Sequence, residues 1–214
     1  NTRSVVELAI GQIILLMRST FVRSTELHNG IWNKTASGAR EVRGKVLGII
    51  GYGNIGKQLS VLAEAMGMKV IFYDQLEKLA LGNAEKRNSM KAVFSEADVV
   101  SLHVDDNSDN KNLIGREEFS QMKDGVVFIN LARGFVVDIP ALVEAQNSGK
   151  VAGVAVDVYP VEPKSNDEPF LSELSGQPNT ILTPHIGGST MEAQKHIGNF
   201  VPVNIISYVN TGSC

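Results

Sequence analysis

Six short apolar runs follow one another from residue 46 onward, and helix-length segments separate most of them. The runs are VLGII (46–50), KVIFY (69–73), DVVSLHV (98–104), VVFINLA (126–132), VAGVAVDV (151–158) and NTILTP (179–184). Helical patterns fall at 55–67, 89–97, 116–123 and 138–148. A strand that is apolar along its whole length is typical of a parallel sheet covered on both faces. The pattern predicts an α/β fold with a doubly wound, parallel six-stranded sheet flanked by helices.

The stretch LGIIGYGNIGKQ (47–58) carries the spacing G-x-G-x-x-G at Gly51, Gly53 and Gly56. This spacing is weak evidence alone, because the chain has 20 glycines and such a motif can simply form a turn. Here it follows the first strand and opens the first helix, and the second strand ends at Asp74. In that context the glycines permit a tight turn and close approach of a pyrophosphate to the helix N-terminus. We therefore predict a Rossmann-type dinucleotide site.

Asp74 indicates which dinucleotide is preferred. Its carboxylate can accept hydrogen bonds from the adenosine ribose and would repel a 2′-phosphate, and no arginine is adjacent to it. NAD is therefore expected rather than NADP.

Three polar residues follow neighbouring strands at the edge where ligands bind in such sheets. Arg133 follows the fourth strand and could bind a carboxylate through two hydrogen bonds. His185 follows the sixth strand and could carry a proton, while Glu162 could stabilise the charged imidazole. Each has a simpler alternative: an ion-paired arginine, a satisfied polar histidine and a solvent-facing glutamate. His103 ends the third strand and either lines the cofactor crevice or fills the core.

The two ends of the chain are predicted to be helical. Residues 4–28 contain an apolar helix, with Ser4 and Glu7 as a capping box, that packs either in the core or against another subunit. A second helix is expected over 189–210, capped by Ser189 or Thr190. Residues 1–188 then form the nucleotide-binding domain, and 189–214 return toward another domain.

Composition excludes several other classes of protein. The net charge of −3 argues against a nucleic-acid surface. Cys214 is the single cysteine, so neither a disulfide nor a thiolate metal site forms within the chain, and no metal is expected. The apolar run AIGQIILLM is too short to span a membrane. A reducing, cytoplasmic location is expected.

The motifs in combination resemble the D-isomer-specific 2-hydroxyacid dehydrogenase family. The resemblance rests on GIIGYGNIGKQ with FYD, DVVSLHV, INLARGFVVDIPALVEA, GVAVDVYPVEP and LTPHIGGSTMEAQ, and it extends over essentially the whole chain. It implies a catalytic set of Arg133, Glu162 and His185. It also implies cofactor contacts at Asn54, Ile55, Asp74, Leu131, Ala132, Arg133, Asp157, His185, Gly187 and Gly188.

The resemblance also implies a reaction and an assembly. Hydride transfer between NAD and a phosphorylated 2-hydroxyacid, 3-phosphoglycerate, is expected, in a homodimer or larger homo-oligomer. Reduction of glyoxylate or hydroxypyruvate is the alternative reaction, and an NAD-gated interaction module of the corepressor type is the alternative class.

Two features depart from the family pattern. The family usually has proline after SLHV and a threonine further on, whereas this chain reads DDNSDNKN, with Asn110 near the place of the threonine. Family members also begin with a substrate domain that has no counterpart here. The chain is therefore expected to be a nucleotide-binding domain that binds cofactor but turns over little by itself.

Overall fold

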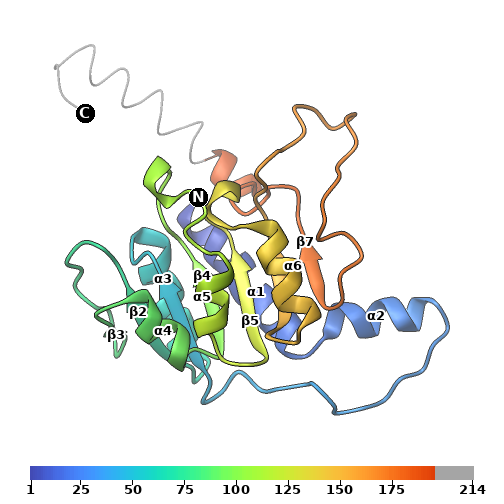
Figure 1. Cartoon of the computed structure of the whole chain (residues 1–214), viewed down its shortest axis with the longest axis horizontal. Coiled ribbons are helices and arrows are strands. Elements are labelled where there is room, and N and C mark those ends of the chain that lie inside the picture. Colours follow the sequence, from blue (N-terminus) through green and yellow to red (C-terminus); the bar gives the residue numbers. More distant parts are fainter. Residues whose placement is uncertain (196–214) are drawn as a thin grey trace.

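The computed structural model describes residues 1–195, and they form one parallel sheet with helices on both faces (Figure 1). The strand order is β3-β2-β1-β4-β5-β6-β7, and every pairing is parallel. The strands are β1 (Val46–Ile50), β2 (Lys69–Tyr73), β3 (Glu85–Lys86), β4 (Val99–Leu102), β5 (Val126–Asn130), β6 (Val151–Val156) and β7 (Thr180–Leu182). The predicted α/β class and doubly wound sheet are confirmed.

All six predicted strands are present, but the sheet has a seventh that the pattern missed. β3 is only two residues long and pairs with Ile71 and Phe72 at the edge of the sheet. Its residues, Glu85 and Lys86, are polar, so no apolar run marks it. The prediction of six strands was therefore one too few.

Five helices cover the two faces of the sheet. One face is covered by α1 (Thr2–Met17) and α3 (Asn54–Ala65), and the other by α4 (Met90–Glu96), α5 (Arg116–Gln121) and α6 (Ile139–Asn147). Successive strand residues point to opposite faces. Val127 and Ile129 accordingly belong to the core beneath α1 and α3, and Val126 and Phe128 to the core beneath the other three helices. This double burial explains why the strands are apolar throughout.

The N-terminal segment is two helices rather than the single predicted helix. α1 ends at Met17, Ser19 adopts the left-handed conformation with φ of 49°, and α2 (Thr20–His28) then begins. The capping-box prediction was also wrong. Helix α1 already begins at Thr2, so Ser4 lies within it and hydrogen bonds to the Thr190 hydroxyl at 2.9 Å, while Glu7 pairs with Arg3.

Helix α1 is a core helix with one exposed apolar strip. Ile13 and Leu16 are buried against the sheet, whereas Ile14 and Leu15 are 38% and 37% exposed. α2 buries no residue and projects from the body of the molecule (Figure 1). Within residues 1–195 no single helix is long and apolar enough to cross a membrane; α1 and α2 meet that criterion only as a pair, which is bent by 68°.

The C-terminal prediction is only partly covered by the described residues. Thr190 does cap a helix: its hydroxyl accepts from the Ala193 amide at 3.1 Å, and helical structure follows at 191–195. The remainder of the predicted 189–210 helix lies outside the described residues.

Candidate active site

The glycine motif forms a cradle between β1 and α3. Gly51 has φ of +91°, and a Cβ there would lie 2.5 Å from the His103 carbonyl oxygen. A Cβ at Gly56 would lie 2.5 Å from the Gly51 carbonyl oxygen, so both glycines are needed by the protein's own packing. Gly53 differs, because nothing lies within 4 Å of its missing Cβ. The space beside it is open to a ligand.

The N-terminus of α3 lies beside this open space, and within residues 1–195 no side chain caps it. Gly53 is its N-cap and supplies no side-chain hydrogen bond. The first amides of a helix have no acceptor within the helix and carry partial positive charge. The arrangement therefore fits the diphosphate of a dinucleotide. The contacts predicted for Asn54, Ile55 and the three glycines stay predictions.

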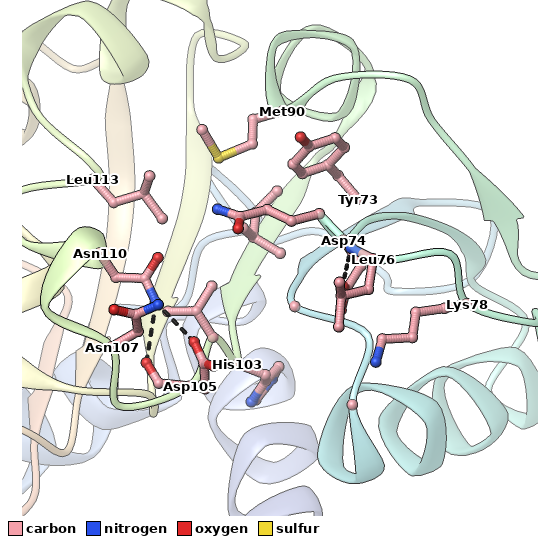
Figure 2. Close-up of a pocket in the computed structure, with 15 residues that line it drawn as sticks. Tyr73, Asp74, Leu76, Lys78, Met90, His103, Asp105, Asn107, Asn110 and Leu113 are labelled. Carbon is pink, nitrogen blue, oxygen red and sulfur yellow. Dashed lines mark hydrogen bonds between the residues drawn. The ribbon is translucent and has the colours of Figure 1, made fainter.

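A cavity of about 370 Å³ lies next to the cradle, at the point where the strand order reverses between β1 and β4 (Figure 2). Asp74 lies on its wall at the end of β2. Its two carboxylate oxygens accept from the amides of Tyr52 (2.8 Å) and Leu76 (2.9 Å), which fixes the glycine turn against β2. Each oxygen keeps a further lone pair for a ribose hydroxyl.

Lys78 lines the same cavity, and sequence reasoning missed it. Figure 2 shows Lys78 on the Asp74 side of the pocket and Asn107 and Asn110 on the opposite side. Lys78 therefore adds a positive charge to the pocket that Asp74 also lines.

His103 lies at the base of this cavity and is 9% exposed, so it both lines the crevice and belongs to the interior. Its Nε2 is 2.9 Å from the Ser101 hydroxyl, and its Nδ1 has no protein partner among the described residues. Burial lowers the pKa of His103 to about 4. The imidazole is therefore neutral near pH 7.

This burial predicts a specific pH dependence of stability. Between pH 6.5 and about 4 the unfolded chain binds a proton at His103 that the folded chain does not. Neutral His103 makes its full contribution to the free energy of unfolding above pH 6.5. This contribution is lost as the pH falls, at up to about 1.4 kcal/mol per pH unit. The free energy of unfolding, measured by urea titration at several pH values in this range, should fall less steeply with decreasing pH for His103→Gln than for the wild-type chain. Equal slopes would contradict the prediction.

A second pocket, of about 330 Å³, lies beyond the carboxyl ends of β5 and β6. It brings together the predicted catalytic residues Arg133 and His185 with several of the other predicted cofactor contacts: Ile55, Leu131, Ala132, Asp157, Gly187 and Gly188. Asn1, Val5, Val158 and Ser189 also line it and were not predicted for the site. Asn54 and Gly56 line neither pocket, since they lie in the cradle between them.

Asp157 organises the turn that carries His185. Its carboxylate is buried and accepts from the Thr183 hydroxyl and from the amides of Ile186 (2.9 Å) and Gly187 (2.8 Å). His185 itself has φ of +53°, a left-handed conformation that is unfavourable for a side chain with a Cβ. The hydrogen bonds that Asp157 accepts from the amides of Ile186 and Gly187 hold this turn. The cofactor contact predicted for Asp157 stays a prediction.

Glu162 and His185 form a direct pair. His185 Nδ1 lies 2.8 Å from Glu162 Oε2, and the Tyr159 amide donates to Glu162 Oε1 at 3.0 Å. Partial burial raises the pKa of Glu162, but the bonds from His185 and Tyr159 and the charge of Arg133 outweigh it, so the pKa lies below its usual value. Glu162 is therefore an anion suited to stabilise a charged imidazole. His185 Nε2 remains available to a substrate.

Arg133 lies at the end of β5, 43% exposed. Its Nε is 3.0 Å from Asp106 Oδ2, and its Nη1 donates to the Ala132 carbonyl at 2.8 Å. The ion pair with Asp106 was not predicted, because the two residues lie in different loops and no local pattern relates them. The simpler alternative for Arg133, an ion-paired residue, is thus partly correct.

Comparison with known proteins defines the class. Residues 10–187 match the model of the "D-isomer specific 2-hydroxyacid dehydrogenase, NAD binding domain", and the chain belongs to this family. The predicted family and its NAD-binding class are confirmed.

A curated relative and two solved structures show which members of the family this chain is similar to. D-3-phosphoglycerate dehydrogenase of Haemophilus influenzae is 54% identical over 100% of this chain, which covers 52% of that protein. The chain thus spans about half the length of the curated relatives it matches. A glyoxylate reductase structure from Paecilomyes thermophila is 34% identical with a TM-score of 0.86, covering 98% of this chain and 63% of that one. The NAD-complexed dehydrogenase of Lactobacillus delbrueckii ssp. bulgaricus is 26% identical with a TM-score of 0.89, covering 99% and 68%.

Proposed function

We propose that this chain is the NAD-binding and proton-transferring part of an enzyme that oxidises 3-phosphoglycerate to 3-phosphohydroxypyruvate, the first step of phosphorylated serine biosynthesis. The observation that carries the proposal is the Glu162–His185 pair, 2.8 Å apart, whose histidine shares a pocket with Arg133 at the carboxyl edge of the sheet. The 54% identity to a phosphoglycerate dehydrogenase, against 34% to a glyoxylate reductase, supports this substrate over glyoxylate.

The chain's own residues divide the work as follows. The cradle at Gly53 and the N-terminus of α3 would hold the cofactor diphosphate, and Asp74 the adenosine ribose. NAD, when bound, would supply the acceptor for the hydride from C2 of the hydroxyacid. His185 accepts the proton of the C2 hydroxyl, so the substrate loses a hydride and a proton together. Glu162 stabilises the imidazolium that results, and Arg133 binds the substrate carboxylate.

The test compares this chain with the longer protein expected to carry it, in one NADH-absorbance assay with 3-phosphoglycerate, glyoxylate and hydroxypyruvate. We expect the longer protein to turn over and prefer 3-phosphoglycerate. The 214-residue chain should bind NADH with little turnover, because it spans about half the length of its curated relatives and the remaining half would close over the reactive end to exclude water. Equal turnover by both would contradict this account. NADH binding without turnover in either would support the interaction module.

Cofactor preference gives a second prediction. The chain should bind NADH at least about tenfold more tightly than NADPH, or about 1.4 kcal/mol, because Asp74 disfavours a 2′-phosphate. Asp74→Ala should reduce the ratio of NADH affinity to NADPH affinity. Lys78→Ala should increase this ratio, since it removes a positive charge from the same pocket. Fluorescence titration of both cofactors measures the ratio; equal affinities in the wild-type chain would exclude the role given to Asp74.

The assembly of the chain gives a third prediction. We propose a cytoplasmic homodimer that buries the exposed strip of α1. Ile14→Asp and Leu15→Asp should then give a folded monomer, because both side chains are partly exposed. Ile13→Asp is the matched control: Ile13 is fully buried, so this change should unfold the chain rather than separate subunits. Sedimentation with circular dichroism distinguishes the cases, and a folded wild-type monomer at micromolar concentration would refute the dimer.

A further inference from the structure

The loop that follows β4 lines the cavity beside the glycine cradle and also reaches Arg133. Asp105, Asn107 and Asn110 line the cavity beside the glycine cradle. Asn110 is buried, and its side-chain nitrogen donates to the backbone carbonyl (3.1 Å) and to the carboxylate (2.9 Å) of Asp105, which fixes the loop (Figure 2). Asp106 lies between these residues and instead pairs with Arg133. A single loop thus joins the cofactor rim to the arginine of the reactive end.

The way in which Arg133 is held leaves part of its guanidinium available. The Asp106 carboxylate lies 3.0 Å from Nε in an ion pair, and the Ala132 carbonyl accepts one hydrogen of Nη1. A guanidinium has five N–H donors. Both hydrogens of Nη2 and the second hydrogen of Nη1 have no hydrogen-bond partner within residues 1–195. These donors are sufficient to bind a carboxylate in the bidentate manner.

We propose that Asp106 is a positioning residue: it holds Arg133 through Nε so that the Nη groups are presented to the substrate carboxylate. The inference rests on the proposed function, because it assumes that Arg133 binds the carboxylate. An arginine on the surface samples many rotamers, and fixing it before the ligand arrives removes that entropy cost from binding.

The opposite effect of Asp106 is electrostatic, since its carboxylate would also repel an incoming anion. Asp106 is 64% exposed, so solvent screens much of that repulsion. We therefore expect positioning to outweigh repulsion. The two effects predict opposite results for one pair of variants. Asp106→Ala removes the side chain and its charge, whereas Asp106→Asn removes the charge, and with it the ion pair, at nearly unchanged size.

The first experiment uses this chain and needs no turnover. The ¹⁵N-labelled Arg133 Nε–H signal is assigned by its loss in Arg133→Lys, and oxalate is titrated as a small dicarboxylate probe. Asp106→Ala should shift or broaden the signal and weaken oxalate binding about three- to tenfold. Asp106→Asn should have the same effect, because it removes the ion pair at Nε while keeping the size of the side chain. Asp109→Ala is the matched control, because Asp109 is in the same loop but, in the described part of the chain, forms no hydrogen bond or ion pair with Arg133, and its loss should change neither.

The second experiment is kinetic and uses the longer protein. Asp106→Ala should raise KM for 3-phosphoglycerate by a similar factor, with a smaller change in kcat and no change in NADH affinity. The inference would be wrong if Asp106→Ala left both the Arg133 signal and the oxalate affinity unchanged, or if it tightened oxalate binding. Absence of turnover in the wild-type longer protein would instead count against the proposed function, and the signal of Arg133 would still decide the role of Asp106.

Discussion

His185→Gln is expected to lower kcat for oxidation of the hydroxyacid by about 10²- to 10⁴-fold in the longer protein, which is the usual contribution of a positioned general acid or base. Glutamine can hydrogen bond but cannot take the hydroxyl proton. NADH affinity should persist, because the cradle and Asp74 lie in the other part of the site. Stopped-flow measurement of hydride transfer isolates this step from product release.

Glu162→Gln is the companion variant. It keeps a hydrogen bond to His185 Nδ1 but removes the negative charge that stabilises the imidazolium. Proton transfer from the hydroxyl during oxidation should therefore be slower, because the imidazolium that it forms is no longer stabilised by a carboxylate. His185→Gln should slow this proton transfer further, because it removes the base itself. A Glu162→Gln enzyme or a His185→Gln enzyme with the wild-type kcat would show that this pair does not carry the proton.

Gly134→Ala is expected to cost about 3 kcal/mol of folding free energy, at the upper end of the usual cost of overpacking. A Cβ at Gly134 would overlap the Tyr159 carbonyl group and the Pro160 nitrogen, all of which are backbone atoms. No side chain can rotate away to make room. The end of β5 would have to separate from the segment that leads to Glu162, so Arg133 would also move away from the histidine pair.

Gly11→Ala provides the control for that measurement. Gly11 lies inside α1, and nothing lies within 4 Å of the position that an added methyl group would take, so alanine should stabilise the helix by about 0.4–1 kcal/mol. Urea midpoints of the two variants should therefore move in opposite directions. A Gly134→Ala chain that unfolds at the wild-type midpoint would show that the backbone contact is not constraining.

The sequence predicted the parts of this molecule that repeat or that lie at strand ends. The six apolar strands are buried on both faces, and that burial leaves a continuous pattern. Glu162 and His185 were predicted to meet because they follow successive strands of one parallel sheet, and they do. Their positions follow from topology, which a periodic sequence reveals.

The parts that were missed depend on contacts between loops. Asp106 reaches Arg133 from a different loop, and Lys78 reaches the Asp74 pocket from an irregular segment. Neither contact joins residues at a regular spacing in the sequence, so no sequence pattern indicates it. The break at Ser19 was missed for another reason: the apolar run ends near it, but one left-handed residue, not a glycine or proline, separates the helices. Such a turn is set by packing at the end of α1 and leaves little trace in composition.

The packing of α1 also has a consequence for how the chain acquires its structure. α1 is synthesised before every strand of the sheet, yet it contacts β5, β6 and β7, and its Leu16 carbonyl accepts from Asn179, 163 residues later. Contacts so distant in sequence form late and slow the folding of parallel sheets. On the ribosome, the apolar face of α1 must therefore wait for the last strand, and during that interval it is a binding site for chaperones and a starting point for aggregation.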